Sequence, residues 1–415
     1  MTRALLILLI CAATAQAQTG AGVVGEVRVH GNHTTPDARV LEIVGEVVGK
    51  PATDALVAEV VDKLERSGQF DSVEVRKRFR SIDNPDDILL MIVVDEFAGV
   101  DPLDDYMPPN PVRRFWGSGM FLPILSSEDG YGFTYGGRVS FVDRFGPRSR
   151  ISIPLTWGGE RQARVQAERT FRSGAIDRVS GEAGIGRRVN PHYEIADRRT
   201  QFNTRIESAA VRWLRLGAGG GVDDVTFGDL TDTIKRVGAD VTLDTRVDPA
   251  FPRNAVHATF GWERLNFEAL SANRRTADLR GYVGLFGQTV LAVRGLSVTS
   301  DTAMPLYEQL LLGGAANLRG YDAGFKANDN LAALSAELRI PMTSPLSVGR
   351  FGVKAFVDAG TAYPFGQKLK NQKQLDRGIG AGAYFHLTVL SLALDVARSR
   401  EGNTRFHFGL GVTFK

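Results

Sequence analysis

A glycine-rich stretch in the C-terminal half of the chain surrounds an arginine that could bind carboxylates. Residues 313–321 read Gly-Gly-Ala-Ala-Asn-Leu-Arg-Gly-Tyr and lie between two strand-like segments. Because glycine readily adopts positive φ, this stretch is predicted to form a compact loop. The guanidinium of Arg319 presents a planar fork of donors that matches a carboxylate. Taken alone, the loop is also typical of an ordinary solvated turn, so the surrounding elements must decide.

The sequence contains none of the motifs that would indicate an enzyme. It has no Gly-x-Ser-x-Gly, no glycine-rich phosphate loop before a helix and no His-Glu-x-x-His, and its six histidines lack metal-ligand spacing. Asp223, Asp224 and Asp229 lie in a glycine-rich segment that could bind calcium, but a loop of solvated carboxylates is the simpler interpretation. We therefore predict a non-enzymatic protein with no metal site and no cofactor.

The first residues have the pattern of a secretory signal peptide. Arg3 provides the positive charge, residues 4–13 form a short apolar run, and Ala-Gln-Ala at 15–17 matches a cleavage site. Residues 1–17 are therefore predicted to be removed, together with Cys11, the single cysteine. The mature chain would be exported and would fold without disulfides. The net charge of +3 is spread along the chain, so nucleic acid is not an expected partner.

Residues 22–97 have the pattern of a small α+β domain in the order βααββ. Apolar residues alternate in three segments and recur at helical spacing in two others. Pro36 begins the first helix and Thr53 caps the second, as these residue types prefer. The predicted elements are a strand at 23–29, helices at 36–44 and 53–64, and strands at 73–79 and 88–94.

The remainder of the chain is predicted to be mainly β, joined to the first domain by a linker. Residues 98–111 are acidic and rich in proline, which disfavours sheet pairing. Residues 112–415 then alternate in polarity, with charges of both signs in mid-strand and aromatic residues at the edges of several apolar faces. These features favour a transmembrane antiparallel β-barrel over a secreted β-sandwich. Spanning strands of ~9–11 residues give about sixteen segments, and residues 115–135 fit one strand or two.

The N-terminal domain resembles a polypeptide-transport-associated (POTRA) domain. The likeness is carried by Val-Arg-Val-His-Gly-Asn at 27–32 and Ser-Gly-Gln-Phe-Asp-Ser-Val at 67–73. The resemblance implies a periplasmic domain that binds client chains by adding a strand to the edge of its sheet. The alternative is a spacer that only orients the domain that follows it.

The C-terminal region resembles the BamA/TamA outer-membrane protein assembly superfamily, also called the bacterial surface antigen family. The likeness is carried by Leu-Arg-Gly-Tyr at 318–321, Ala-Glu-Leu at 336–338, Phe-x-Asp-x-Gly at 356–360, Gly-Ile-Gly-Ala-Gly at 378–382, and Asp-Thr-Arg at 244–246 followed by Pro252. The resemblance implies that the loop between the eleventh and twelfth strands folds into the lumen, where Arg319 pairs with acids on the wall. By position and strand parity those acids are Glu337 and Asp358. The expected site residues are Arg319, Gly320, Tyr321, Glu337 and Asp358 in a loop lock, and Gly313, Gly314, Phe356 and Gly360 in the family motif.

The last strand resembles the C-terminal signal by which outer-membrane proteins are themselves recognised. Its apolar residues are Phe408, Leu410, Val412 and Phe414, and the additional Lys415 is a departure from the pattern. In the family, the seam between the first and last strands opens laterally. Gly409 and Gly411 weaken side-chain packing in this strand, which is compatible with opening and equally with simple curvature.

The resemblance implies an outer-membrane assembly or translocation factor. Its POTRA domain would receive unfolded client polypeptides in the periplasm, and its barrel would insert or export them. The expected partners are the outer-membrane bilayer, client polypeptides and accessory proteins of the periplasm or outer membrane, with no nucleotide or cofactor. A dedicated two-partner-type secretion pore and a passive outer-membrane channel are the alternatives. The single POTRA domain departs from the best-known members, which have several, and leaves open a general insertase or a specialised relative.

Overall fold

The computed structural model describes residues 22–412 except 33–34, 81–83, 85, 97–118, 147, 172–173, 250, 343–348, 373 and 387–389. The predicted signal peptide and linker therefore lie outside the described residues. No helix in the part of the chain that is described has the length and apolar character needed to cross a membrane.

The N-terminal domain has the predicted βααββ order. Its elements are β1 (Val23–His30), α2 (Asp37–Val44), α3 (Asp54–Arg66), β2 (Phe70–Phe79) and β3 (Asp87–Glu96). β3 is central, parallel to β1 and antiparallel to β2. The Thr53 hydroxyl accepts a hydrogen bond from the Leu56 N–H at 3.1 Å and so caps α3 as predicted. Apolar residues of both helices and the sheet form one buried core.

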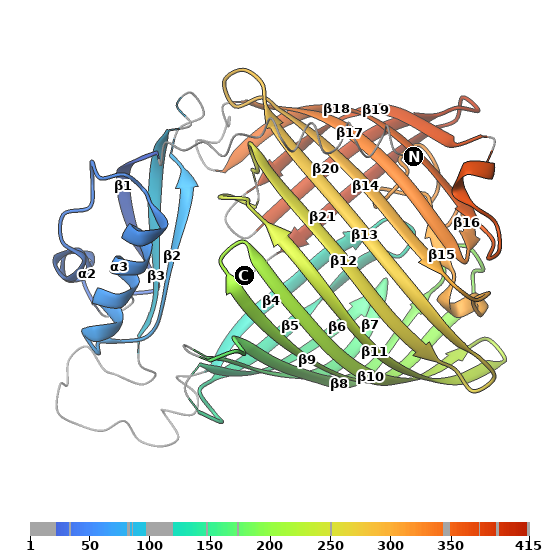
Figure 1. Cartoon of the computed structure of the whole chain (residues 1–415), viewed down its shortest axis with the longest axis horizontal. Helices are drawn as coiled ribbons and strands as arrows, with labels where there is room; N and C mark the ends of the chain where they lie inside the picture. Colours follow the sequence, from blue (N-terminus) through green and yellow to red (C-terminus); the bar gives the residue numbers. More distant parts are fainter. Residues whose placement is uncertain are drawn as a thin grey trace.

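The C-terminal region is a closed barrel of sixteen antiparallel strands, which confirms the predicted architecture (Figure 1). The strands are β4 (Gly119–Glu128), β5 (Gly132–Val142), β6 (Ser149–Gly158), β7 (Glu160–Thr170), β8 (Arg178–Val189), β9 (Ala196–Val211), β10 (Leu214–Phe227), β11 (Leu230–Asp244), β12 (Ala255–Asn266), β13 (Ser271–Gly284), β14 (Val290–Ser300), β17 (Asn330–Met342), β18 (Arg350–Tyr363), β19 (Asp376–His386), β20 (Leu390–Ser399) and β21 (Thr404–Val412). The stretch 115–135 holds β4 and the start of β5.

The alternation in the sequence places apolar side chains on the outside of the barrel. Phe406 is 72 % exposed and Phe121 is 66 % exposed, and many other outward-facing apolar residues are similarly uncovered. A belt of this extent is unfavourable in water and favourable in hydrocarbon. The inward faces of the strands carry charges such as Glu337 and Asp358, both buried within the lumen.

The barrel closes at a weak seam between its first strand, β4, and its last, β21. Within the described residues these strands share two residue pairs, Leu410 with Ser127 and Gly411 with Ser126. The next shortest pairing, between β6 and β7, has six. Backbone hydrogen bonds in a barrel are the main connection between strands, so this seam (β4 with β21) is the easiest place to part the wall.

The long connection between β14 and β17 contains its own short elements and lies at the barrel end opposite the N-terminal domain (Figure 1). It includes the 3₁₀ helix η1 (Leu306–Glu308), the short strands β15 (Leu310–Leu312) and β16 (Lys326–Asn328), which pair with each other, and the glycine-rich stretch between them. A second 3₁₀ helix, η2 (Leu369–Asn371), lies between β18 and β19. We call residues 301–329 the lumenal loop.

The N-terminal domain contacts the barrel through arginines at the near ends of the strands. The contacts are Arg148 with Glu65, Arg212 with Asp54, and Arg350 with the backbone carbonyl of Phe79. Arg148 and Arg212 lie in the turns that follow β5 and β9, so α3 and the end of β2 face the barrel mouth. The Arg212–Asp54 pair is exposed and contributes little, whereas the Arg148–Glu65 pair is more buried.

The position of Asp71 predicts that this contact depends on pH. Burial, together with the hydrogen bond and charge of Asp143 in the turn after β5, raises the pKa of Asp71 to about 7. Because this pKa lies above the ordinary 3.8, the contact is strongest in acid and weakens as pH rises through 7. The distance between spin labels on the two domains should therefore increase between about pH 4 and about pH 7, the interval between the two pKa values. The Asp71→Asn variant should lose this dependence; a pH response that persists in it would contradict the assignment.

Candidate functional site

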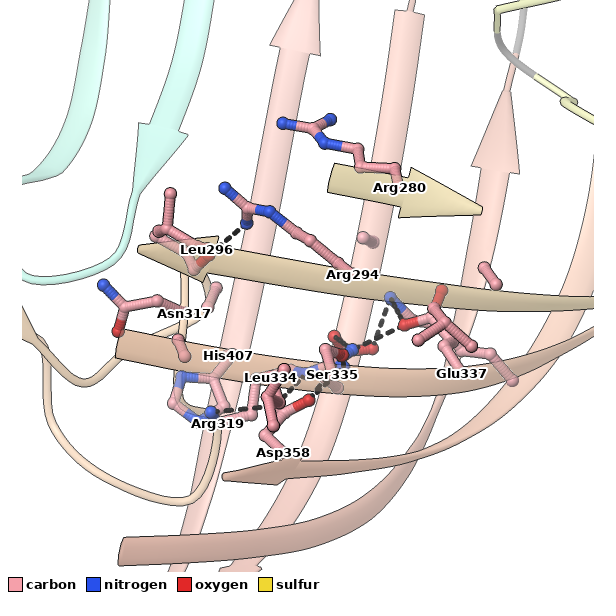
Figure 2. A pocket seen from close by; sticks show the side chains of 18 of the residues that line it. Arg280, Arg294, Leu296, Asn317, Arg319, Leu334, Ser335, Glu337, Asp358 and His407 are labelled. Atoms are coloured by element: carbon pink, nitrogen blue, oxygen red, sulfur yellow. Dashed lines mark hydrogen bonds and ion pairs between the residues drawn. The ribbon is translucent and has the colours of Figure 1, made fainter. Parts of the chain in front are cut away.

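Arg319 lies inside the barrel and reaches acidic side chains on neighbouring strands (Figure 2). Its Nε and Nη2 donate to the two carboxylate oxygens of Asp358 on β18, at 2.7 and 2.9 Å. Its Nη1 donates to Glu337 Oε2 on β17 at 2.6 Å. The structure thus brings together Arg319, Glu337 and Asp358, three of the five residues that were expected in the loop lock.

Three further contacts complete the surroundings of the guanidinium. Nη1 also donates to Asp395 Oδ2 on β20 at 3.3 Å, and Nη2 donates to the Ser335 hydroxyl at 3.2 Å. The guanidinium carbon lies 3.3 Å from the centre of the Phe356 ring, a cation–π contact. Every N–H of the guanidinium therefore has an acceptor. Asp395 and Ser335 were not singled out from the sequence, although the alternation of β20 places Asp395 on the lumenal face.

The cluster balances charge as well as hydrogen bonds. Lys354 Nζ lies 2.9 Å from Asp395 Oδ1, and Arg339 Nε donates to Glu337 Oε1 at 2.7 Å. With Arg319 and Asp358, three cations face three carboxylates, all but Arg339 at most about one-tenth exposed. Buried ions are tolerated only when they are paired in this way, so removing one member leaves a charge without compensation.

The glycine-rich stretch folds as it does because its backbone and Asn317 hold one compact turn. Asn317 accepts from the Gly313 N–H at 2.8 Å and donates to the Leu311 carbonyl at 2.9 Å. Gly313 has φ of +115°, and a Cβ there would lie 2.0 Å from the Asp322 carbonyl oxygen. The neighbouring Gly314 accepts from Leu318 and donates to Tyr321 along the backbone. Leu318 and Tyr321 are buried with Leu312, Leu331 and Ala333.

Gly378 on β19 lets the loop approach the wall, and this gives a prediction. A Cβ at Gly378 would lie 1.9 Å from the Arg319 carbonyl oxygen, far inside van der Waals contact. Gly378→Ala should therefore displace the loop and lower the free energy of unfolding by roughly 1–3 kcal/mol, as overpacking usually does. The midpoint of urea unfolding, followed by the heat-modifiable gel shift, measures this. Gly281→Ala on β13, where a Cβ meets nothing within 4 Å, is the matched control; an equal loss in both variants would contradict the close approach.

Glu308 at the end of η1 forms a second buried anchor that was not expected from the sequence. Its carboxylate accepts from Arg199 Nη1 at 2.7 Å and from Arg274 Nη2 at 2.9 Å, and it lies 3.8 Å from Arg236. Arg199 also donates to the carbonyl of Tyr307, whose ring packs in an apolar cluster with residues of β10, β11 and the β12–β13 turn. Burial alone would raise the pKa of Glu308, but Arg274, Arg199 and Arg236 together hold its pKa below the ordinary value. Nothing in the sequence indicated this role, because a single acidic residue in a loop has no distinguishing pattern.

The interpretation of Asp223 as part of a solvated loop was wrong. Asp223 and Asp224 lie within β10. Asp223 is buried, and its Oδ2 accepts a hydrogen bond from Arg236 Nη2 at 2.5 Å. The side chain of Asp223 faces the lumen, where it contacts Arg199 and Arg236, two of the arginines that also contact Glu308. Among the described residues, no group of three or more His, Cys, Asp or Glu side chains is arranged to hold a metal ion.

The residues predicted as a C-terminal signal are partly described. Phe408 is exposed on the outer face of β21, and Leu410 pairs with Ser127 across the seam. Val412 ends β21 opposite Leu390, and Phe414 lies outside the described residues. Phe356 and Gly360 of the predicted motif both face the loop: Phe356 beneath Arg319, and Gly360 close to Leu312.

Beside the Arg319 cluster the lumen retains a cavity of about 310 Å³ (Figure 2). Its walls include the loop, the strands that hold Arg319, and cations from β13 and β14 such as Arg280 and Arg294. Arg294 donates to the carbonyl of Ala316, so the loop contacts this wall too. The loop contacts both this wall and the wall that holds Arg319, so a large object could pass between them only if the loop moved.

Comparisons with known proteins agree with this architecture. An Omp85 superfamily domain matches residues 126–414, and a POTRA model described as a surface antigen variable number repeat matches residues 22–96. BamA from Haemophilus ducreyi lacking POTRA domains 1–3 has a similar structure, with a TM-score of 0.63 and 15% identity over 94% of this chain and 84% of that one. CdiB from Acinetobacter baumannii is also similar, with a TM-score of 0.53 and 12% identity over 95% of this chain and 74% of that one. No curated protein matches the sequence.

The structural likenesses, at such low identity, show the fold alone, whereas the family match spans well over half of the chain. The barrel, its exposed apolar belt and the lumenal loop are those of an outer-membrane protein. The chain therefore belongs to the Omp85 superfamily of outer-membrane β-barrels, non-enzymatic proteins that insert or secrete polypeptides, and its N-terminal unit is a POTRA domain of the periplasm.

Proposed function

We propose that this chain inserts unfolded client polypeptides into the outer membrane through the seam between β4 and β21. The observation that carries the proposal is the shortness of that seam, with two residue pairs in the described part of the wall. A client strand that pairs with a freed edge satisfies its backbone groups before it meets lipid. The seam is therefore both the weakest part of the wall and a template for a new strand.

The alternative routes through the lumen are more costly. Parting the seam breaks the hydrogen bonds of two described residue pairs, and the incoming client strand replaces them. Clearing the lumen means separating Arg319 from its acids and Glu308 from its arginines. Stranding a buried charge costs about 3–5 kcal/mol at each anchor. This comparison favours insertion over a passive channel, and over export unless the loop is first released.

The POTRA domain offers a place for clients to arrive. Among the described residues β2 pairs with β3 and with no other strand, so its other edge is open to a further strand. The end of β2, at Phe79, contacts Arg350 at the barrel mouth. An extended client added to β2 would therefore lie close to the periplasmic end of the barrel.

Reconstitution with a lockable seam tests the proposal. A Cys11→Ser chain carrying Ser127→Cys and Leu410→Cys can be cross-linked across the seam, because paired strand residues have suitable Cα separations. In liposomes, the reduced chain should fold a urea-unfolded outer-membrane barrel faster than empty liposomes do, and oxidation should remove the gain. A disulfide between Phe202→Cys and Val222→Cys, on β9 and β10, is the matched control and should have no effect. Equal folding with and without the seam cross-link would overturn the proposal.

The range of clients is decided by depletion in the native bacterium followed by a census of outer-membrane proteins. A general fall in barrel proteins supports a general insertase, and loss of one secreted protein supports dedicated export. An unchanged census would contradict both.

A further inference from the structure

His407 contacts three parts of the barrel at once. It lies on β21, is 3 % exposed, and points into the lumen beside the loop (Figure 2). Its Nδ1 lies 2.6 Å from Asp129 Oδ2, in the turn that follows β4. Its Nε2 lies 2.9 Å from the Gly320 backbone nitrogen in the lumenal loop. One imidazole therefore contacts both sides of the seam and the loop.

The bonding partners determine the tautomer. Gly320 N–H can only donate, so Nε2 must accept, and Nδ1 then carries the proton that it donates to Asp129. Asp129 Oδ2 also accepts from the Ala315 N–H at 3.1 Å. Although burial raises the pKa of Asp129, the bonds from His407, Ala315 and Gly130 bring it below the ordinary value, so the acceptor stays charged. The neutral imidazole is thus held between a carboxylate across the seam and a backbone donor of the loop.

The position of His407 in the register makes this contact important. If the antiparallel register of the two seam pairs continued, His407 would lie level with the turn after β4, just beyond the last residue pair. The His407–Asp129 bond therefore extends the seam where backbone pairing ends. Arg405 on the same strand also contacts the loop, 2.8 Å from Asp322, but both side chains are largely exposed and the pair is weak.

We propose that His407 is a positioning residue that couples the lumenal loop to the seam, so that each opens more readily when the other is released. The inference rests on the proposed role of the seam as the client route. When the seam parts, Asp129 leaves the imidazole, the ring is no longer held, and the Gly320 N–H loses its acceptor. Gly320 is next to Arg319, so the disturbance reaches the Arg319 cluster directly. The coupling is reciprocal, since linked equilibria must be.

Seam cross-linking in the purified chain, without any client, measures this coupling. The probe is the rate of disulfide formation between Ser127→Cys and Leu410→Cys in a Cys11→Ser background, with glutathione disulfide as oxidant. Releasing the loop with Arg319→Ala should slow cross-linking by about tenfold, a typical coupling between linked sites. In a His407→Asn chain, whose amide can still donate to Asp129 but cannot accept from Gly320, Arg319→Ala should change the rate by less than about twofold.

Two controls separate coupling from general loosening. His192 also contacts the loop, with Nδ1 2.6 Å from the Gly324 carbonyl, but it lies in the turn between β8 and β9, away from the seam. His192→Asn should therefore leave the tenfold effect of Arg319→Ala intact. In His407→Gln, the longer amide can accept from Gly320 but cannot donate to Asp129. This variant should therefore uncouple the loop from the seam, as His407→Asn does. An Arg319→Ala effect that is the same with and without His407 would overturn the proposal.

A second measurement avoids the Arg319 variant, which could fail to fold. In the chain that retains His407, forming the seam disulfide should protect the Arg319–Gly320 peptide bond from trypsin. Mass spectrometry of the digest measures this cleavage. The protection should disappear in His407→Asn, and its persistence would contradict the coupling. Neither measurement uses a client, so coupling and insertase activity are tested separately. A chain that inserts clients without coupling contradicts the coupling alone, and a coupled chain that inserts no client contradicts the proposed function alone.

Discussion

Arg319→Ala is expected to destabilise the barrel by roughly 3–5 kcal/mol and to release the lumenal loop. The variant leaves Glu337, Asp358 and Asp395 facing one another, with Lys354 and Arg339 as the remaining counter-charges. Each of these acids is at most one-tenth exposed, so in the folded barrel they depend on paired cations for compensation. The measurements are the urea midpoint of the heat-modifiable band and protease cleavage within the loop. An unchanged midpoint and an unchanged gel shift would show that Arg319 does not hold the loop.

The stranded charge, rather than the lost contact, should dominate this effect. Replacing Arg319 and Asp358 together by Leu removes one charge of each sign, so it should cost less than Asp358→Asn alone. Arg280→Ala is a matched control, since Arg280 is also a lumenal arginine paired with an acid, Asp278, but is 35% exposed. It should change the free energy of unfolding by no more than about 1 kcal/mol.

Glu308→Gln is expected to loosen the far end of the loop and to open the barrel to ions. The substitution leaves Arg199, Arg236 and Arg274 around a neutral amide. Their remaining acidic partners are Asp197, Asp223 and Glu263, respectively. Loss of a buried charge partner predicts a fall of about 3–5 kcal/mol in the free energy of unfolding. Planar-bilayer conductance should show large openings that are rare in the parent chain, because η1 and Tyr307 no longer close that end.

The pH dependence of the same anchor follows from the direction of the Glu308 pKa. Because the pKa is held below its ordinary 4.5, the stabilisation is fully present above pH 4.5 and is lost only as the carboxyl takes up a proton in stronger acid. The parent chain should therefore stay closed through neutral pH. Glu263→Gln is the matched control: Glu263 contacts Arg236 and Arg274 at 3.4 and 3.8 Å but is 30% exposed. If it opened the barrel as fully as Glu308→Gln, burial at Glu308 would not be the cause.

Local patterns in the sequence were sufficient for the elements and for one side of the site. Alternation with a period of two defines which residues of a strand share a face, and turn-forming residues separate the strands. These two signals predict the sixteen-stranded barrel, the βααββ domain and the lumenal direction of Glu337 and Asp358. The Arg-Gly-Tyr motif identified the loop, and its resemblance to a known family supplied the pairing of Arg319 with those acids. Asp223 shows the limit of such patterns, because a glycine-rich segment was taken for a loop where it continues a strand.

Only the tertiary structure decided which residues, distant in the sequence, meet inside the barrel. Arg319 meets Asp395 across 76 positions of sequence, Arg199 meets Glu308 across 109, and His407 meets Asp129 across 278. Alternation predicts that Asp395, Arg199 and His407 face the lumen, but it does not predict which loop or turn residue each of them meets. That depends on the tilt and stagger with which the strands close, and on how a long loop folds back between them. Closure also brings the last strand, β21, against the first, β4. This places His407 where it contacts both the seam and the loop.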